Sequence, residues 1–212
     1  MRIYGDIYSG NCYKIKLICA LLAIEHEWVA VDIMQGETRV DSFLALNPNG
    51  QIPVCITDDG ENLTESNAIL YYLAQDSDYW PRERLAQTRV LEWQFFEQYS
   101  HEPKIAVARF IKVYQGMPND RRQEYEACLK GGYRALDLME RHLQKRAFLV
   151  GDSCSIADIS LFAYTHVAPE GGFDLAAYPR IRDWIASIQL LPGFVAMPPA
   201  SSRAASDVSQ LY

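Results

Sequence analysis

The sequence predicts two domains of different class, a small α/β domain followed by a larger all-helical domain. Over residues 1–76, short β-like runs alternate with helical periodicity, whereas apolar residues beyond residue 87 recur only at helical spacing. Residues 77–87 (SDYWPRERLAQ) combine a proline with alternating charges, which is typical of a linker. We therefore expect domains at 1–76 and 88–212, joined by a linker at 77–87.

The first domain is expected to follow a βαβ-ββα order. The first two strands flank a helix and should be parallel, because such crossovers are right-handed. The Asp58-Asp59-Gly60 turn should join the last two strands as a hairpin. This order is the thioredoxin-like plan. The expected strands are Arg2–Ile7, Trp28–Ile33, Ile52–Thr57 and Glu61–Leu63, and the expected helices are Asn11–Ile24 and Ser66–Gln75.

The second domain is predicted to be a helical bundle. Pro103 should kink or break its first helix, since proline lacks the N–H that an α-helix needs. The final segment, PPASSRAASDVSQLY, is small and polar, and it should be mobile unless it docks. Three apolar stripes have helical spacing: Leu91, Phe95 and Tyr99; Tyr125, Leu129, Leu136, Met139 and Leu143; and Ile181, Trp184, Ile185 and Ile188.

Charge and hydropathy exclude several classes of partner. The net charge is -7, and residues 1–76 carry 4 Lys/Arg against 11 Asp/Glu. An acidic chain without a basic tract is a poor match for nucleic acid or an anionic membrane. The longest apolar run, Leu17–Ile24, is too short to span a bilayer, and the first residues lack a secretory pattern. We expect a soluble, cytoplasmic protein.

The cysteines and histidines are not spaced as ligands or disulfide pairs. The five cysteines form no C-x-x-C pair, and the four histidines form no H-x-x-x-H pair. Neither a zinc site nor a disulfide framework is therefore predicted, and reduced thiols fit best. We expect no metal.

A first candidate motif is SGNCYK, residues 9–14, where the first strand meets the first helix. The helix end and hydrogen bonds from Ser9 or Asn11 would stabilise a thiolate held there. Lowering a thiol pKa by about two units needs ~2.7 kcal/mol, which such groups can supply. The alternative is that Ser9 or Asn11 only caps the helix.

A second motif, NPNGQIP, covers residues 47–53 and leads into the third strand. If the Ile52–Pro53 bond is cis, the N–H and C=O of Ile52 face outward and can pair with a peptide ligand. The alternative is an ordinary turn before an edge strand.

A third motif, Glu65-Ser66, opens the last helix of the first domain. Ser66 can present its hydroxyl and its N–H to a carboxylate at the positive helix end. Glu65 can accept from an ammonium group. The pair suits a zwitterionic α-amino acid end, although a capped helix would look the same.

Together, the three motifs resemble the glutathione-binding half of the soluble glutathione transferases. Ser9 matches the catalytic serine of the theta, delta and zeta classes, and Asn11 matches an asparagine that contacts the thiolate in some bacterial members. The resemblance is thus to a bacterial-like, serine/asparagine-type, nu-related transferase. In the second domain, Ser155 and Asp158 resemble the family's N-capping box, in which serine caps the helix and the acid reaches back. The likeness runs from Ile3 to about Phe194.

The resemblance implies a homodimeric glutathione S-transferase that acts in detoxification. Glutathione would be the co-substrate, and the second partner would be a small electrophile or a peroxide. Ser9 and Asn11 would stabilise the thiolate. The other implied glutathione-binding residues are Gln51, Ile52, Pro53, Glu65 and Ser66.

Several alternatives remain open at this stage. Tyr4 and Tyr8 are rivals of Ser9, because other classes use a tyrosine hydroxyl. Cys12 is expected to be the more buried, inert residue, with a mixed disulfide as the lesser option. The whole chain could also be a non-catalytic, transferase-like binding or regulatory module, or a glutathione-dependent disulfide reductase.

Basic residues in the first helix of the second domain have two interpretations. Arg109 and Lys112 lie three positions apart and should share a helix face near Lys104. They would either hold an acidic substrate or the glycyl carboxylate of glutathione, or form a solvated basic face.

Overall fold

A computed structural model describes residues 1–202, in two compact units. The first unit is Met1–Ser77 together with the segment that starts at Pro192, and the second is Asp78–Leu191. The predicted boundaries differ from these units at two places. Helix α4 (Arg84–Phe96) begins inside the expected linker, and the segment from Pro192 groups with the first unit rather than with the helical one.

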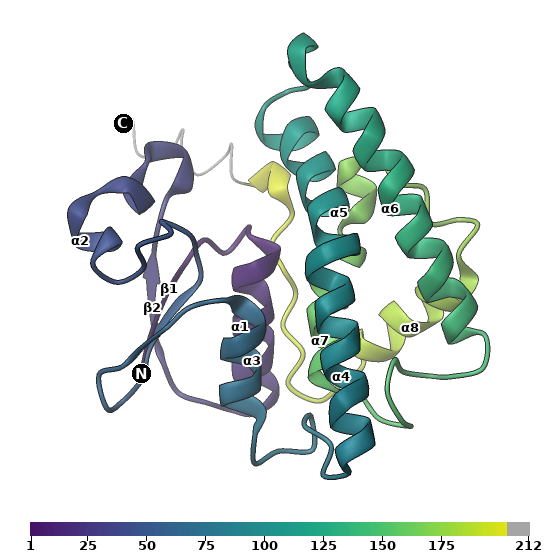
Figure 1. The fold of residues 1–212 in the computed structure, drawn as a ribbon, viewed down its shortest axis with the longest axis horizontal. Coiled ribbons are helices and arrows are strands. Elements are labelled where there is room, and N and C mark those ends of the chain that lie inside the picture. Colours follow the sequence, from purple (N-terminus) through teal and green to yellow (C-terminus); the bar gives the residue numbers. More distant parts are fainter. Residues whose placement is uncertain (203–212) are drawn as a thin grey trace. The chain divides into compact units, whose positions relative to one another are not determined.

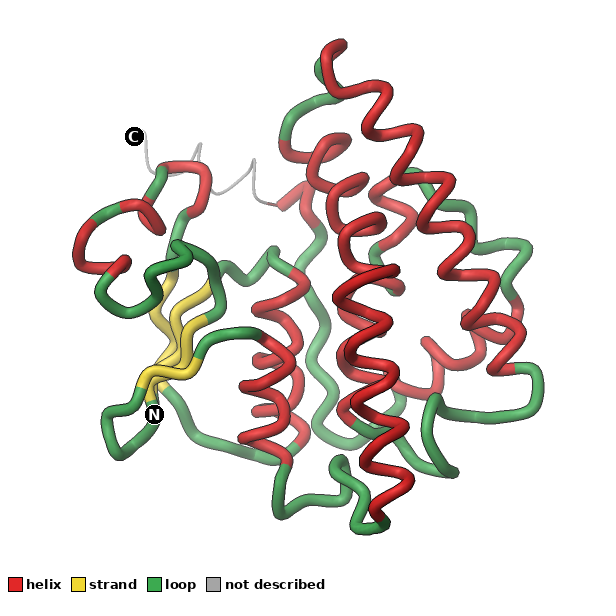
Figure 2. Tube along the Cα trace, in the orientation of Figure 1, coloured by secondary structure: helices red, strands yellow, loops and turns green. Residues whose placement is uncertain are grey.

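The first unit contains a mixed four-stranded sheet in the order β2-β1-β3-β4. Strands β1 and β2 are parallel, and the β1–β3 and β3–β4 pairs are antiparallel, which confirms the thioredoxin-like fold class. Helices α1 and α3 lie side by side on one face of the sheet, and α2 lies beyond the other (Figures 1 and 2). The elements are β1 (Arg2–Gly5), α1 (Gly10–Leu21), β2 (Glu27–Ala30), α2 (Asp41–Leu44), β3 (Val54–Ile56), β4 (Asn62–Leu63) and α3 (Ser66–Ala74).

Close packing of β1 on α1 fixes the turn between them. A Cβ atom at Gly5 would lie 2.9 Å from Sγ of Cys12, so a larger residue would push the strand and helix apart. Ile3 on β1, and Ile15 and Ile18 on α1, are fully buried. The turn at residues 6–9, which carries Ser9, therefore has little freedom to move.

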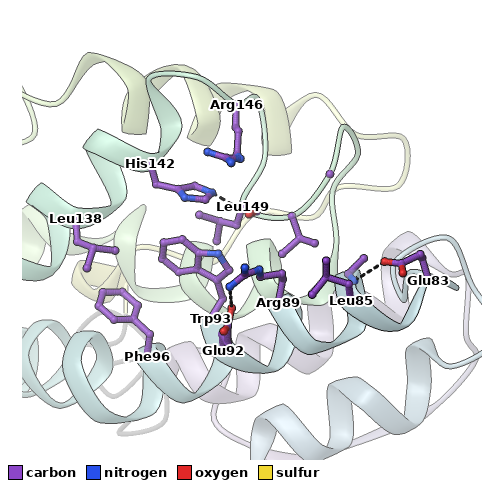
Figure 3. A pocket seen from close by; sticks show the side chains of 13 residues that line it. Glu83, Leu85, Arg89, Glu92, Trp93, Phe96, Leu138, His142, Arg146 and Leu149 are labelled. Atoms are coloured by element: carbon purple, nitrogen blue, oxygen red, sulfur yellow. Dashed lines mark hydrogen bonds and ion pairs between the residues drawn. The ribbon is translucent and has the colours of Figure 1, made fainter.

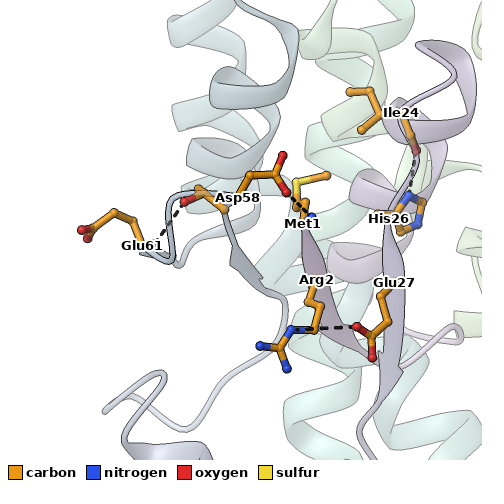
Figure 4. A network of polar contacts seen from close by, with 8 residues as sticks. Met1, Arg2, Ile24, His26, Glu27, Asp58 and Glu61 are labelled. Carbon is orange, nitrogen blue, oxygen red and sulfur yellow. Dashed lines mark hydrogen bonds and ion pairs between the residues drawn. The ribbon is translucent and has the colours of Figure 1, made fainter.

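Polar contacts along the strand ends add little to the stability of the sheet (Figure 4). The N-terminal ammonium group pairs with the exposed carboxylate of Asp58, and Arg2 Nε lies 3.9 Å from Glu27 Oε2. Exposed ion pairs contribute about 0–1 kcal/mol each. The apolar core, rather than these pairs, holds the sheet together.

The second unit is all-helical around a central helix, α7. Every residue of α7 is buried; the helix packs against α4 and α5, while α6 packs against α5 and α8. Among residues 1–202, no helix is both long enough and apolar enough to cross a membrane. The helices after α4 are α5 (Glu102–Arg109), α6 (Arg122–Leu143), α7 (Ile156–Thr165) and α8 (Pro179–Gln189).

The predicted effect of Pro103 is confirmed. The α-helical hydrogen bonding of α4 gives way to a π-helical turn at Glu97–His101, and α5 then begins with Pro103 in its first turn. Proline has no N–H, and its ring crowds the carbonyl of Tyr99 four residues earlier. A π-turn relieves that crowding without ending the helix.

The apolar stripe on α4 and on the π-helical turn after it faces away from the core of its unit. Leu91, Phe95 and Tyr99 are 40%, 71% and 88% exposed, whereas Val90 and Trp93 supply the buried side of α4. Four-residue spacing alone does not tell which side of a helix meets the core. The other two stripes have buried members: Leu136, Met139 and Leu143 on α6, and Ile181, Trp184 and Ile188 on α8.

Part of the C-terminal segment docks on the first unit. Tyr13 Oη donates to the carbonyl of Val195 at 2.7 Å, and Ser202 Oγ donates to Tyr8 Oη at 3.3 Å. Met197 is buried as well. The rest of the segment whose mobility was predicted, residues 203–212, lies outside the described residues.

Candidate functional site

Ser9 lies at the start of α1, as the N-cap residue. Its N–H donates to the carbonyl of Asp6 at 3.0 Å, and its Oγ accepts from the N–H of Cys12 at 3.5 Å. The capping role proposed as the alternative is therefore present. Capping uses a lone pair of the hydroxyl, and the hydroxyl also hydrogen-bonds the side chain of Cys12, a contact that an incoming thiolate would replace. Capping and thiolate stabilisation are thus compatible at this residue.

Cys12 is buried one turn into the same helix. Burial raises the pKa of its thiol to about 12, so the thiol is neutral at physiological pH. The predicted burial of Cys12 is confirmed, and a neutral, buried thiol agrees with the expectation that it is inert. All five cysteines are free and buried.

Asn11, Ser66 and Lys14 form a polar cluster where α1 meets α3. Ser66 Oγ donates to Asn11 Oδ1 at 3.4 Å, and Lys14 Nζ donates to Ser66 Oγ at 3.2 Å. Lys14 Nζ also lies 3.5 Å from Asn67 Oδ1. The fold thus brings together two residues predicted for opposite ends of one ligand, the thiol end at Asn11 and the carboxylate end at Ser66.

The loop before β3 is held by Asn47, and it contains a cis peptide bond between Ile52 and Pro53. Asn47 Nδ2 donates to the carbonyl of Gln51 at 2.8 Å, and Asn47 Oδ1 accepts from the N–H of Asn49 at 3.1 Å. The Ile52 side chain packs against the core, while Gln51 is exposed. Among residues 1–202, the N–H and C=O of Ile52 pair with no other group, which leaves both able to bind a peptide.

Glu65 has an unusual backbone conformation just before α3. Its φ and ψ are 65° and 111°, a region that a residue with a Cβ atom rarely adopts. Such a conformation costs about 1–3 kcal/mol, and residues that carry it cluster at functional sites. The Glu65 side chain is exposed, next to the buried Ser66.

The two rival tyrosines have other partners. Tyr4 packs against Val31 and Phe43, and its Oη accepts from Arg2 Nη1 at 3.4 Å. Tyr8 lies next to Ser9, and its Oη accepts from Ser202. Only Tyr8 is therefore adjacent to the start of α1.

Arg109 and Lys112 both lie against the segment Gly171–Gly172, which agrees with the predicted shared helix face, but together they do not form a solvated basic face. Arg109 is only 2% exposed; its Nε donates to Glu170 Oε2 at 2.6 Å, and its guanidinium lies over the ring of Tyr114. Lys112 is exposed, and Lys104 is half-buried against Gly131. The ion pair of Arg109 lies inside the helical unit, so this residue forms neither a solvated basic face nor an open anion site.

A separate open groove of about 680 Å³ lies within the helical unit (Figure 3). It is bordered by α4, by the end of α6 and by residues 146–151. His142 Nε2 lies 2.9 Å from the carbonyl of Leu149, and burial lowers the pKa of this histidine. Arg89 and Glu92 pair at 2.6 Å along its edge. None of the residues predicted to bind glutathione lines this groove.

Lys14 was not among the site residues predicted from the sequence. The residue is fully buried in α1, and it contacts Ser66. A sequence signal did exist, because Asn11 and Lys14 are three positions apart and so share a helix face. Nothing in the sequence indicated that this face meets the start of α3.

Comparisons with known proteins identify the family. Residues 8–76 match the family model "Glutathione S-transferase, N-terminal domain", and residues 96–192 match "Glutathione S-transferase, C-terminal domain". A glutathione S-transferase structure from Pseudomonas fluorescens Pf-5 is 56% identical, with a TM-score of 0.92, and the match covers 93% of this chain and 98% of that one. Glutathione S-transferase 3 of Zea mays is 29% identical over 97% of this chain and 99% of its own length.

A third relative is a maleylacetoacetate isomerase from Methylobacterium extorquens AM1, solved with bound malonate and glutathione. It is 27% identical, with a TM-score of 0.77 over 91% of this chain and 94% of that one. The family-model matches cover both the α/β and the helical part of the chain. This chain belongs to the glutathione S-transferase family.

Proposed function

We propose that the chain is an active glutathione S-transferase, which stabilises the glutathione thiolate for attack on a small electrophile or a peroxide. The observation that carries this proposal is the 3.4 Å contact between Asn11 and Ser66, residues that are 55 positions apart in the sequence. One is predicted to serve the thiol of glutathione and the other its γ-glutamyl carboxylate. The glutathione bound in the isomerase relative supports the same ligand here.

The proposed binding mode uses three segments of the first unit. Ser66, at the N-terminus of α3, donates its hydroxyl and N–H to the γ-glutamyl carboxylate, and the exposed Glu65 accepts from the ammonium group. The free N–H and C=O of Ile52, held next to the buried Pro53, pair with the cysteinyl main chain. The exposed Gln51 assists from the same loop.

The proposed chemistry depends on stabilising an anion. Ser9 and Asn11 hydrogen-bond the sulfur at the positive end of α1, and both favour the thiolate over the thiol. The thiol proton leaves to water or to the carboxylate of glutathione itself. The sulfur then attacks an electrophilic carbon, forming a C–S bond as the leaving group departs, or a peroxide oxygen, forming glutathione sulfenic acid as the O–O bond breaks and the released alkoxide takes up a proton. No covalent enzyme intermediate forms.

Replacing Ser66 with alanine is expected to weaken glutathione binding by roughly 1–3 kcal/mol, since a carboxylate would lose a hydroxyl donor. Isothermal calorimetry measures the change, and Ser42→Ala, at an exposed serine of α2, is the matched control. Unchanged affinity in Ser66→Ala would mean that the carboxylate binds elsewhere.

We further propose that the protein is a homodimer that works in the cytoplasm in detoxification. The five buried free thiols support a reducing compartment. The exposed stripe of Leu91, Phe95 and Tyr99 supports a contact between two copies, because large exposed apolar patches mark interaction sites. A two-fold contact needs a self-complementary surface, and the nearby pair of Arg89 and Glu92 supplies both signs of charge.

A charge placed in this stripe should separate the two copies. Phe95→Asp is expected to shift the sedimentation coefficient from that of a dimer to that of a monomer, because the interface would bury an unpaired carboxylate. Leu190→Asp, at an exposed leucine after α8, is the control and should stay dimeric. A wild-type protein that sediments as a monomer would refute the dimer, and a dimeric Phe95→Asp would exclude this face.

A further inference from the structure

Lys14 carries a charge into the interior of the first unit. Its side chain is 0% exposed, and its Nζ donates to Ser66 Oγ at 3.2 Å. Burying an ammonium group costs several kcal/mol, which its partners must offset. A methionine would fill the same space without that cost. Packing alone therefore does not explain why a charged side chain occupies this position.

The contact with Lys14 orients the hydroxyl of Ser66. A serine hydroxyl has one proton and two lone pairs, and Lys14 donates to one of the lone pairs. The proton therefore points away from Lys14, and it is directed to Asn11 Oδ1 at the long distance of 3.4 Å. A carboxylate is a stronger acceptor than this amide oxygen. An incoming carboxylate would therefore replace Asn11 as the acceptor of the hydrogen bond from the Ser66 hydroxyl.

The charge itself acts in the same direction. Ser66 is the first residue of α3, so the helix end already favours an anion at its N–H. Lys14 adds a full positive charge directly behind the hydroxyl, in a buried place where water screens it little. Both effects favour a carboxylate over a neutral group in front of Ser66.

We infer that Lys14 is a positioning residue for the γ-glutamyl α-carboxylate of glutathione, acting through the hydroxyl of Ser66. This inference rests on the function proposed above, and it adds a determinant of selectivity. Lys14 should set the preference for ligands that carry a carboxylate at this end, while contributing little to recognition of the rest of the tripeptide.

Two ligands and two variants test the inference. The ligands are glutathione and 4-aminobutanoyl-cysteinylglycine, which lacks only the α-carboxylate. Lys14→Met should lose about tenfold in affinity for glutathione, as for one charge-assisted hydrogen bond, and little for the analogue. Lys14→Arg keeps the charge and should restore part of the preference. Calorimetry gives the affinities, and circular dichroism checks the fold.

The outcomes separate the two proposals. If the wild type does not bind glutathione, the proposed function fails, and this inference fails with it. A different outcome is that the wild type binds glutathione while Lys14→Met either lowers the affinity for both ligands by the same factor or changes neither affinity. In that case Lys14 is only structural, and the proposed function stands. A selective loss with the fold intact supports the inference.

A measurement on the wild type covers the case in which Lys14→Met does not fold. The ¹⁵N signal of the Lys14 ammonium group, assigned by its disappearance in Lys14→Arg, should shift when glutathione is added and should stay in place with the analogue. The inference would be overturned if both ligands shifted this signal equally, or if glutathione bound without shifting it.

Discussion

Replacing Asp158 with alanine is expected to destabilise the protein by about 3–5 kcal/mol, which would be the largest stability effect of any single change proposed here. The Asp158 carboxylate is fully buried at the start of α7. It accepts from the N–H groups of Leu149 and Ser155 at 2.8 and 2.9 Å, and from Ser155 Oγ and Trp184 Nε1, both at 2.9 Å. Alanine would leave these buried donors without their acceptor, and each such loss costs about 1–3 kcal/mol.

Variants at neighbouring positions test this account of Asp158. Ser155→Ala removes one donor and part of the capping box, and it should cost only about 0.5–2 kcal/mol. Asp158→Asn keeps an acceptor oxygen and should fall between the two. Asp183→Ala, at an exposed aspartate of α8, is the control. Urea unfolding gives the free energies. An Asp158→Ala protein that unfolds like the wild type but loses turnover would show that the residue serves the reaction.

The capping box shows what a local pattern can and cannot predict. The spacing of Ser155 and Asp158 identified the start of α7 correctly, and it implied the modest cost of a lost helix cap. It could not show that Leu149 and Trp184 also donate to the same carboxylate. Those partners come from other elements, so only the three-dimensional packing reveals how much depends on Asp158.

The same limit applies to the candidate site. Local rules predicted the sheet, the effect of Pro103 and the position of Ser9 at the start of α1, because each depends on neighbours in sequence. The contact of Lys14 with Ser66 joins two helices, and no periodicity encodes it. The burial of Arg109 could not be predicted for a related reason, since its partner Glu170 is distant in the sequence.

Removing the hydrogen-bonding side chains of both Ser9 and Asn11 is expected to have the largest effect on activity. Each lost donor should raise the thiol pKa of bound glutathione by about one unit, or ~1.4 kcal/mol. With a wild-type thiol pKa of about 6.5, two units below a free thiol, the thiolate fraction at pH 7, and with it the conjugation rate, should then fall about threefold for a single variant and about 25-fold for the double. Raising the pH above the new pKa restores the thiolate, so activity should recover partly in alkali.

The measurement is the ultraviolet absorbance of the thiolate in the enzyme–glutathione complex, titrated against pH. The proteins are the wild type, Ser9→Ala, Asn11→Ala and the double variant. Ser9→Thr keeps both the hydroxyl and the helix cap, so it controls for the 0.5–2 kcal/mol of stability that Ser9→Ala loses with its cap. If the double variant titrates like the wild type, the thiolate is stabilised elsewhere, with Tyr8, Tyr4 or Cys12 as the next candidates.

The two single variants should also differ from each other, and the difference follows from their contacts. The Ser9 side chain contacts Cys12 in the first turn of α1, so its loss should change the thiol pKa and leave glutathione affinity nearly constant at low pH, where the thiol is neutral. Asn11 also accepts a hydrogen bond from the Ser66 hydroxyl, and a bound carboxylate must replace Asn11 as the acceptor. Asn11→Ala removes that competing acceptor, so it should raise the thiol pKa and improve the affinity for the γ-glutamyl end. Equal effects of both variants on affinity would show that the Asn11–Ser66 contact does not influence binding.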